Sequence, residues 1–393
     1  MRATNAGIWD RVPRKIFTAE DVEGSDTRCP PTTDQRVEAG TTVSDVVSGP
    51  DLAPGFTIAG EINAGRGAVS GMGISPDGDV LMTTQYGDDS VSVIDTATAA
   101  VALTVVDVEE SFAVALSANR AYFSNVSAEH DSVLAFDTTS NEIVAEYPLA
   151  FNVTDLAVSP NGRHLYVGRT DVEGADVAIL DTKTGKEDAI RIAATTGATT
   201  GCVRVSPEGR RLYVAANGSS TAHIVMVDAV QKRVLNAVEI ASPIRDIALS
   251  PDGATAYVGS AGPDFGTVLD IIDTRTSTIT STHKIGEEAG LVAQLTVSRD
   301  GTRAYLVGDQ GVTVLSTATQ DVIGKIAVDG APSCAIESPD GKRLYIADYA
   351  GTVTVLEIAV AAVPAGVQSA DDELTAPHPW AMPDLLLLEP TLA

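Results

Sequence analysis

Cysteine, aromatic residues and long apolar runs are all scarce in this chain of 393 residues. The three cysteines, Cys29, Cys202 and Cys334, are an odd number and show no Cys-x-x-Cys spacing. A disulfide framework and a zinc or iron–sulfur site are therefore not expected. No stretch approaches the roughly 20 apolar residues of a membrane span, and the N-terminal residues lack the apolar region of a Sec signal peptide. The default expectation is a cytoplasmic protein without a membrane span, and export or envelope association by another route is left open.

Positive charge is scarce too. The chain has 26 lysines and arginines against 53 aspartates and glutamates, which gives a formal net charge of -27. Such a charge repels phosphate backbones and anionic membrane surfaces, so nucleic acid is disfavoured as a partner. A basic protein or a cationic ligand remains as a candidate partner, although strong acidity by itself also serves solubility.

A repeat dominates the rest of the sequence. Seven times between Ser70 and Val355 the chain has a short apolar segment, a turn of the Ser-Pro-Asp-Gly type, a Leu-Tyr-Val type segment and a Val-x-Val-Ile-Asp-Thr type segment. The turns start at serines spaced 40 to 48 residues apart, which are Ser75, Ser117, Ser159, Ser206, Ser250, Ser298 and Ser338. This period is typical of one four-stranded blade of a β-propeller. The sequence thus predicts an all-β fold, a seven-bladed β-propeller of four-stranded antiparallel blades.

A tyrosine recurs at one position of the second strand in six repeats, with Met82 in its place in the first. The six are Tyr122, Tyr166, Tyr213, Tyr257, Tyr305 and Tyr345. An aromatic residue at a fixed place in every blade favours packing between neighbouring sheets over a ladder for stacking a ligand.

The repeated segments resemble a known family. HLYVG, RLYVA, AYVGS and RLYIA follow Pro-x-Gly or Asp-Gly turns and precede segments such as ILDT and IIDT, which is similar to the YVTN-type β-propeller repeats of bacterial and archaeal surface-associated proteins. The resemblance covers roughly residues 56–358. Low lysine with abundant Ala, Val, Thr and Asp resembles an actinobacterial member, for example a mycobacterial one, without an assigned activity. The resemblance implies a structural or interaction module and supplies no catalytic motif.

The last repeat lacks a fourth strand, because no strand pattern follows Thr352–Ile358. Residues 56–65, FTIAGEINAG, have the required apolar pattern. We expect them to pair with residues 352–358, so that an N-terminal strand closes the ring and leaves no open sheet edge. The predicted organisation is an irregular arm at 1–54, the propeller at 55–361 and a proline-rich tail at 362–393.

The innermost strand of each blade should line the channel, and one of its positions varies between blades. Four residues before each turn serine stand Gly71, Ala113, Asp155, Cys202, Asp246, Gln294 and Cys334. With the adjacent Arg245, these residues predict a polar channel mouth that could bind a ligand. Asp155 and Asp246 could share a Ca²⁺ ion; otherwise Asp246 pairs with Arg245 and no cofactor is bound. Cys202 and Cys334 should lie too far apart for a disulfide.

Carboxylates also gather in the loops between second and third strands, on what we call the upper face. The candidate contact residues there are Glu129, His130, Asp131, Asp171, Glu173, Asp264 and Asp309. A ring of carboxylates favours a cationic ligand or a basic protein segment. We therefore predict a monomeric, non-catalytic binding or scaffold propeller that contacts its partner through this face. The alternative is a metal-assisted, lactonase-like hydrolase that uses Asp155, Asp246 and His130.

Overall fold

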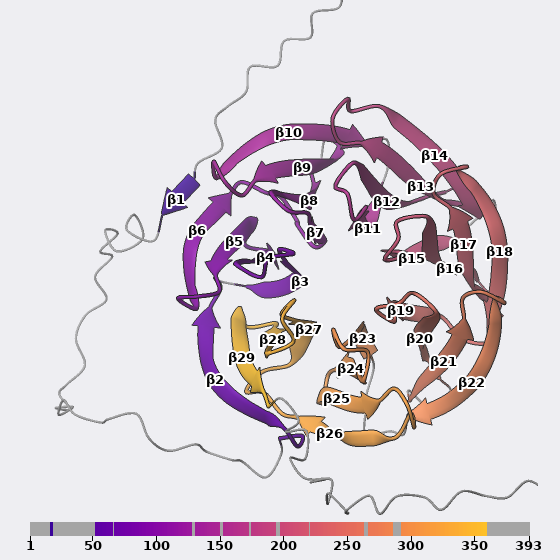
Figure 1. Ribbon diagram of the computed structural model, residues 1–393. Helices are drawn as coiled ribbons and strands as arrows, with labels where there is room; N and C mark the ends of the chain where they lie inside the picture. The colour runs from indigo at the N-terminus through magenta and orange to yellow at the C-terminus, as the bar shows by residue number, and fades with distance from the viewer. Residues whose placement is uncertain are drawn as a thin grey trace, which may run out of the picture. The chain divides into compact units, whose positions relative to one another are not determined.

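Seven antiparallel β-sheets surround a central channel (Figure 1). The structure, a computed structural model, describes residues 16–18 and 52–359, except for positions 66, 128–129, 150–151, 173, 194–196, 220, 263–265 and 286–291. The regular elements among these residues are all strands. The predicted all-β fold of seven blades is confirmed.

Each blade begins at the channel and proceeds outward, apart from the last outer strand of the ring. Blade 1 contains β3 (Ala68–Ile74), β4 (Val80–Tyr86), β5 (Ser90–Asp95) and β6 (Ala100–Val106), and blade 2 contains β7 (Val114–Leu116), β8 (Arg120–Val126), β9 (Asp131–Asp137) and β10 (Glu142–Leu149). Blade 3 contains β11 (Val153–Val158), β12 (His164–Asp171), β13 (Gly174–Asp181) and β14 (Glu187–Ala193), blade 4 contains β15 (Thr199–Val205), β16 (Arg211–Asn217), β17 (Ala222–Asp228) and β18 (Arg233–Ile240), and blade 5 contains β19 (Ile244–Leu249), β20 (Thr255–Ala261), β21 (Thr267–Asp273) and β22 (Thr278–Ile285). Blade 6 contains β23 (Val292–Val297), β24 (Arg303–Gly308), β25 (Gly311–Ser316) and β26 (Val322–Ile326), and blade 7 contains β27 (Pro332–Glu337), β28 (Arg343–Asp348), β29 (Thr352–Ile358) and β2 (Phe56–Asn63).

The outer strand of blade 7 comes from the N-terminal side of the chain. β2 pairs antiparallel with β29, from Phe56 opposite Ile358 to Asn63 opposite Thr352. This pairing was predicted from the missing strand, and it is confirmed. Phe56 is buried against Tyr305 of blade 6, so the closing strand also contributes to the apolar core between blades.

One part of the predicted irregular arm is a strand. β1 (Ile16–Thr18) pairs antiparallel with β6 and extends blade 1 to five strands. Its three residues were too few to give a strand pattern in the sequence. The other residues predicted for the arm up to position 51, and the predicted tail at 362–393, lie outside the described residues.

The serine of the repeated turn organises the chain reversal between the first and second strands. In blade 3 the Ser159 hydroxyl donates to Asn161 Oδ1 (2.8 Å) and accepts from the His164 amide (2.9 Å). The Gly162 amide donates to the Ser159 carbonyl (2.8 Å), and Gly162 has φ of 68°, which glycine adopts without steric cost. The Ser-Pro-Asn-Gly sequence is therefore explained by the geometry of the turn.

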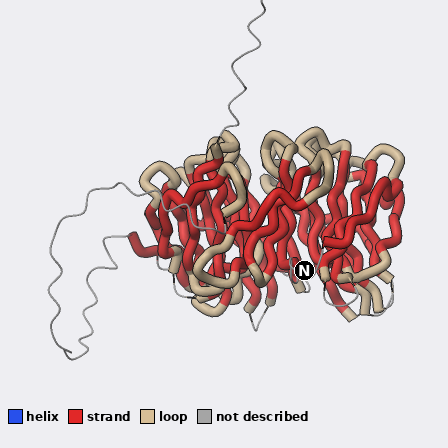
Figure 2. Tube along the Cα trace, turned by 90° about the horizontal axis from the view of Figure 1, so that it is seen from below, coloured by secondary structure: helices blue, strands red, loops and turns tan. Residues whose placement is uncertain are grey.

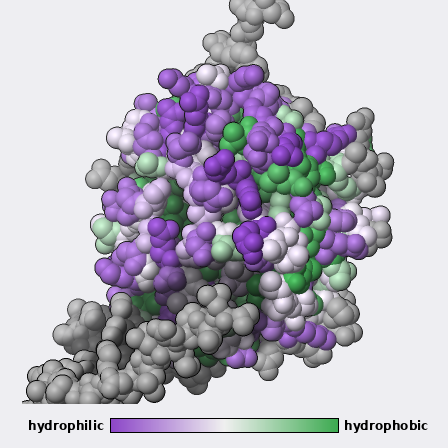
Figure 3. Space-filling model, turned by 45° about the vertical axis from the view of Figure 1, so that its right-hand side comes forward, coloured by the Kyte–Doolittle hydropathy of each residue, from purple (hydrophilic) through white to green (hydrophobic). Residues whose placement is uncertain are grey.

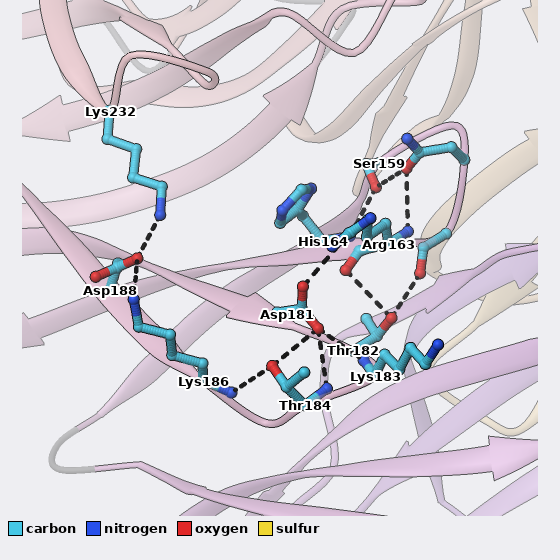
Figure 4. A network of polar contacts seen from close by, with 12 residues as sticks. Ser159, Arg163, His164, Asp181, Thr182, Lys183, Thr184, Lys186, Asp188 and Lys232 are labelled. Atoms are coloured by element: carbon cyan, nitrogen blue, oxygen red, sulfur yellow. Dashed lines mark hydrogen bonds and ion pairs between the residues drawn. The ribbon is translucent and has the colours of Figure 1, made fainter.

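The Asp-Thr pair at the end of the third strand also has a structural role. Asp181 Oδ1 accepts from the amides of Lys183 (3.1 Å) and Thr184 (2.9 Å) in its own turn (Figure 4). The Thr182 hydroxyl donates to the Gly162 carbonyl (2.9 Å) in the serine turn of the same blade. The two turns on this side of the blade are thus held together.

The six recurring tyrosines are buried in the apolar clusters between blades. The Tyr305 hydroxyl donates to Glu337 Oε2 of the next blade (2.8 Å), which fits the expected combination of an apolar ring and a polar tip. Tyr305 is fully buried, and burial followed by the nearby Glu337 charge raises the pKa of its hydroxyl. The repeated tyrosine is a packing residue in this fold.

Loops gather at two opposite ends of the strands (Figure 2). The upper face carries the loops from second to third strand and those from one blade to the next, whereas the lower face carries the serine turns and the Asp-Thr turns. The side shown in Figure 3 is mainly hydrophilic, with smaller hydrophobic areas. This division places any channel-mouth site beneath the acidic loops.

Candidate functional site

The channel along the ring axis is the first candidate site. The innermost strands enclose a cavity of about 700 Å³. Its wall contains the predicted residues Asp155, Cys202, Asp246, Gln294 and Cys334, and also Arg245. The structure therefore brings the predicted channel residues together around one space.

A change of strand register occurs immediately before this position in several blades. The shifts lie between Val153 and Asp155 in blade 3, and between Ile244 and Asp246 in blade 5. Blades 6 and 7 have the same shift before Gln294 and Cys334. Such a bulge bends the strand and re-aims the side chains beside it.

The polar side chains at this position bind the neighbouring blade. In each of three blades, one side-chain oxygen accepts a hydrogen bond from a backbone amide in the next inner strand. The bonds run from Val203 to Asp155 Oδ2 (2.8 Å), from Leu295 to Asp246 Oδ2 (2.8 Å) and from Ala335 to Gln294 Oε1 (2.6 Å). These groups join successive inner strands, a role that the sequence analysis did not assign to them.

Arg204 of β15 lies between the two aspartates. Its Nη1 donates to Asp155 Oδ2 (2.6 Å), and its Nη2 donates to Asp246 Oδ1 (2.5 Å). Its Nε donates to the Ile247 carbonyl (2.9 Å). The side chain is 30% exposed, and the Asp246 side chain is 4% exposed. One guanidinium therefore connects blades 3, 4 and 5.

Arg204 was not among the predicted channel residues, although the sequence contains a signal for it. Two residues before the turn serine the seven blades have Gly73, Ala115, Ala157, Arg204, Ala248, Thr296 and Ile336. Arg204 is the one charged residue in that set. The predicted alternative partner of Asp246 was Arg245, but Arg245 is exposed and the ion pair is made by Arg204.

The charged residues of the channel wall shift the pKa values of one another. Burial raises the pKa of Asp246, and the Arg204 charge opposes that rise. Burial alone would lower the pKa of Arg204, but the Asp246 and Asp155 charges outweigh it and raise the pKa. The guanidinium stays charged and offsets part of the negative charge of the two carboxylates.

The arrangement bears on the predicted cation site. The guanidinium of Arg204 takes the position between Asp155 and Asp246 that a shared Ca²⁺ would need. Within the described part of the chain, no group of three or more His, Cys, Asp or Glu side chains could hold a metal ion. Three arginines, Arg204, Arg245 and Arg299, line the cavity with these two aspartates, so its wall does not favour a cation.

Both cysteines of the ring are free and buried. Burial raises the pKa of the Cys334 thiol to about 12. The pKa of Cys202 is raised well above its ordinary value by burial and then by the Asp246 charge. Neither thiol therefore has the lowered pKa that activates a cysteine nucleophile. The third cysteine, Cys29, lies outside the described residues.

The predicted loop residues have different environments. Asp131 is buried and accepts from the Val153 amide of blade 3 (3.2 Å), while His130 Nε2 lies 3.6 Å from Glu146 Oε1. Asp309 is exposed, and Asp171 is partly buried at the end of β12. Glu129, Glu173 and Asp264 lie outside the described residues. His130 is not among the residues that line the channel, so it does not join Asp155 and Asp246 there.

A more exposed acidic area lies on the upper face of blades 1 and 2. The loops 86–90 and 107–113 carry five exposed carboxylates, Asp88, Asp89, Asp107, Glu109 and Glu110, and contain no Lys or Arg. Tyr86 at the start of this area is 46% exposed. The two loops adjoin, because Asp89 accepts from the Val108 amide through its carbonyl (2.9 Å) and from the Glu110 amide through Oδ1 (3.0 Å).

The upper loop of blade 7 continues this area. Tyr349 there is 53% exposed. The loop packs closely on the backbone of Gly65 and Gly67 through Gly351, and Gly67 packs against Asp88. We call Tyr86, Tyr349 and the five carboxylates the acidic rim surface.

The seven closed blades, with inner strands tied to one another, place the chain in the class of seven-bladed β-propellers. The chain is 43% identical to the seven-bladed beta-propeller protein Rv1057 of Mycobacterium tuberculosis, over 87% of this chain and 94% of that protein. It belongs to the same family of seven-bladed β-propeller proteins, which confirms the predicted bacterial propeller. No protein-family model matches the chain.

A solved structure gives the same fold. The hydrazine synthase of Kuenenia stuttgartiensis matches with a TM-score of 0.68 and 21% identity, over 75% of this chain and 97% of that chain. At this identity the likeness extends to the propeller fold alone. Among the described residues there is no helix with the length and hydrophobicity needed to cross a bilayer.

Proposed function

We propose that this protein is a non-catalytic binding propeller whose acidic rim surface holds a basic segment of a partner protein. The observation that carries the proposal is the combination of five exposed carboxylates with two exposed tyrosines on adjoining loops. Tyrosine contributes a large contact area with a polar tip, and carboxylates steer and orient a positively charged partner.

The state of the channel supports the same proposal. Asp155 and Asp246 are already bound to Arg204 and to backbone amides, and the two thiols in the wall are buried with raised pKa values. Polar groups that hold one another in this way contribute to the stability of the ring. The surface left for a cationic partner is the acidic rim surface rather than the channel wall.

The test compares two variants that each lose three carboxylates. The rim variant is Asp88→Asn/Glu109→Gln/Glu110→Gln, and the matched control is Glu142→Gln/Glu208→Gln/Asp321→Asn, which removes exposed carboxylates from other parts of the ring. The probe is a fluorescent arginine- and lysine-rich peptide, and its binding is followed by anisotropy at physiological salt. Asp89 is left unchanged because it caps the neighbouring loop.

We expect the rim variant to bind the peptide roughly fivefold to a hundredfold more weakly, since each of the three charge pairs contributes a few tenths of a kcal/mol to about 1 kcal/mol at such a surface. The control should stay within about twofold of the parent protein, because ordinary salt screens distant charges. Equal weakening of both variants would show that net charge alone attracts the peptide, and the proposal would be wrong.

A further inference from the structure

The serine turn of blade 2 is shorter than the others. The Ser117 amide donates to the Arg120 carbonyl (2.8 Å), whereas in blade 4 the Ser206 amide donates to the Arg211 carbonyl (2.9 Å). Arg120 therefore occupies the structural position of Arg211, but its turn has two residues fewer. This difference lies on the lower face, at the seam between blades 2 and 3.

The shortened turn also lacks the proline that fills other seams. Between blades 3 and 4 the turn residue Pro160 packs against Gly209, and between blades 4 and 5 Pro207 packs against Gly253. The corresponding glycine of blade 3, Gly162, faces Ser117 instead. A hollow of about 450 Å³ opens at this seam, a size that suits a small molecule.

The short turn changes what the arginine can bind. Arg211 donates from Nη1 to the Thr274 carbonyl of the next blade (2.9 Å). At the seam between blades 2 and 3 the equivalent carbonyl belongs to Thr182, and the Tyr147 hydroxyl already donates to it (2.8 Å). The Arg120 guanidinium makes no hydrogen bond to any residue that the structure describes.

The wall of the hollow is basic in an otherwise acidic protein. Two cationic side chains, Arg120 and Lys183, face it together with the polar residues Ser117, Asn119, Asn161 and Thr182, and no carboxylate is part of the wall. In Figure 4 the Lys183 side chain extends away from the Asp181 carboxylate, which is bound by Arg163 and Thr184. Both cations are thus available to a ligand.

Carboxylates near the hollow are engaged elsewhere. A second hollow of about 420 Å³ shares Arg120, Thr182 and Lys183 and also contains Glu146 and Glu187. Glu187 Oε1 accepts from Arg169 (2.6 Å), and Glu146 Oε1 accepts from the Ser132 hydroxyl (2.9 Å).

The pKa of Asp137 is lowered by amides of its own turn and, to a smaller extent, by the Arg120 charge. Asp137 accepts hydrogen bonds from the Thr139 and Ser140 amides in its own turn. Asp137 therefore takes its hydrogen bonds from the turn amides, and the N–H donors of the Arg120 guanidinium are not used by it.

We propose that the hollow between the blade 2 and blade 3 turns, the seam pocket, binds a phosphoryl group, either as inorganic phosphate or as a phosphate monoester. A guanidinium and an ammonium beside amide and hydroxyl donors are the groups that recognise phosphate oxygens. The net charge of the chain opposes an anion only at long range, because the screening length is about 8 Å at physiological ionic strength. The seam pocket lies on the lower face, so this inference does not depend on the acidic rim surface.

The experiment titrates the full chain with inorganic phosphate, phenyl phosphate and acetate at constant ionic strength, by calorimetry. Arg120→Gln and Lys183→Gln each remove one cation from the pocket, while Arg210→Gln removes an exposed cation from another lower-face turn. A fourth variant replaces residues 117–120 with the six-residue turn of blade 4, residues 206–211. This graft keeps the local net charge and an arginine at the strand start, but it closes the pocket.

We expect saturable binding of a phosphoryl compound, at least about tenfold weaker in Arg120→Gln and Lys183→Gln and lost in the turn graft. Arg210→Gln should stay within about twofold of the parent, and urea denaturation midpoints check that each variant is folded. Phosphate preferred to phenyl phosphate indicates the free ion, and the reverse indicates a monoester. Absent binding, equal affinity for acetate, or the same loss in Arg210→Gln or in the channel variant Arg245→Gln would overturn the proposal.

Discussion

Arg204 Nη2 lies 2.5 Å from Asp246 Oδ1 across the seam between blades 4 and 5. The same guanidinium reaches Asp155 on its other side (2.6 Å), so that three consecutive blades meet at one side chain. A propeller has no single core, and each blade packs only against its neighbours. Apolar packing joins each blade only to its neighbours, whereas this polar contact joins three blades through one side chain.

Replacement of Arg204 by Met should destabilise the ring by about 2 kcal/mol. Removal of one partner from a buried pair costs roughly 3–5 kcal/mol because a charge is left unpaired, and the 30% exposure of Arg204 reduces that figure. Equilibrium urea denaturation measures the change. The double variant Arg204→Met/Asp246→Asn should recover part of the loss, since an amide can still accept from the Leu295 amide. A single variant as stable as the parent would contradict this role.

Gly71 should tolerate no side chain, even though other blades carry Asp or Gln at its position. A Cβ atom at Gly71 would lie 2.5 Å from the Phe112 carbonyl oxygen of blade 2, which is backbone and cannot give way cheaply. We expect Gly71→Ala to lower the free energy of unfolding by about 1–3 kcal/mol. Gly60→Ala is the control, because nothing lies within 4 Å of the added atom. Equal denaturation midpoints for the two variants would refute the steric explanation.

The repeat predicted the fold well because each recurring turn residue has a structural role within its own turn. The bonds of the serine hydroxyl, the glycine φ and the aspartate contacts to turn amides are each set by residues within one turn, so a single sequence reveals them. The closure of blade 7 by β2 was predictable for a related reason. The strand at Thr352–Ile358 would otherwise be an open sheet edge, so its partner had to come from another part of the chain.

The partners of the channel residues were less predictable. Asp155 and Asp246 were predicted as channel residues, but the predicted ion-pair partner of Asp246 was Arg245, the adjacent residue in the chain. A register shift lies between Ile244 and Asp246, and the partner that the fold supplies, Arg204, is 42 residues away. Sequence proximity is a poor guide where a bulge re-aims a side chain. The seam pocket likewise arises from an absence, the two residues missing after Ser117.

Ring closure through β2 should depend on its buried side chains, Phe56 and Ile62, and not on exposed ones such as Ile58. Phe56 is 5% exposed and packs edge-on against Tyr305, with the Arg303 guanidinium 5.2 Å from its ring centre. Phe56→Ala should cost about 3 kcal/mol through the cavity it leaves. Ile58 on the same strand is 50% exposed, and Ile58→Ala should change stability by no more than about 0.5 kcal/mol. Urea denaturation of both variants distinguishes closure by packing from closure by backbone pairing alone.

Cys202 and Cys334 should be unreactive in the folded protein. Burial shields both thiols and raises their pKa values, that of Cys334 to about 12, so little thiolate forms at mildly alkaline pH. In a Cys29→Ser background, a thiol-specific disulfide reagent should react slowly with the native protein. Once urea unfolds the protein, the reagent should react rapidly with both remaining cysteines. Rapid modification of either cysteine in the native state would show that the channel wall opens, or that the thiol is activated.

Asp181 should make the stability of the propeller fall in acid. The Thr184 amide and hydroxyl, followed by the Lys183 amide and Arg163, lower the pKa of Asp181 from 3.8 to about 2. The folded state prefers the ionised carboxyl, so its stabilising effect is full above pH of about 4 and disappears as pH falls towards about 2. The difference in urea midpoint between the parent and Asp181→Ala should therefore shrink over that interval. Asp246 is the opposite case, because burial raises its pKa and its contribution relative to Asp246→Asn should decline as pH rises above about 4. A constant difference for Asp181→Ala across the acid range would show that its turn gains nothing from the charge.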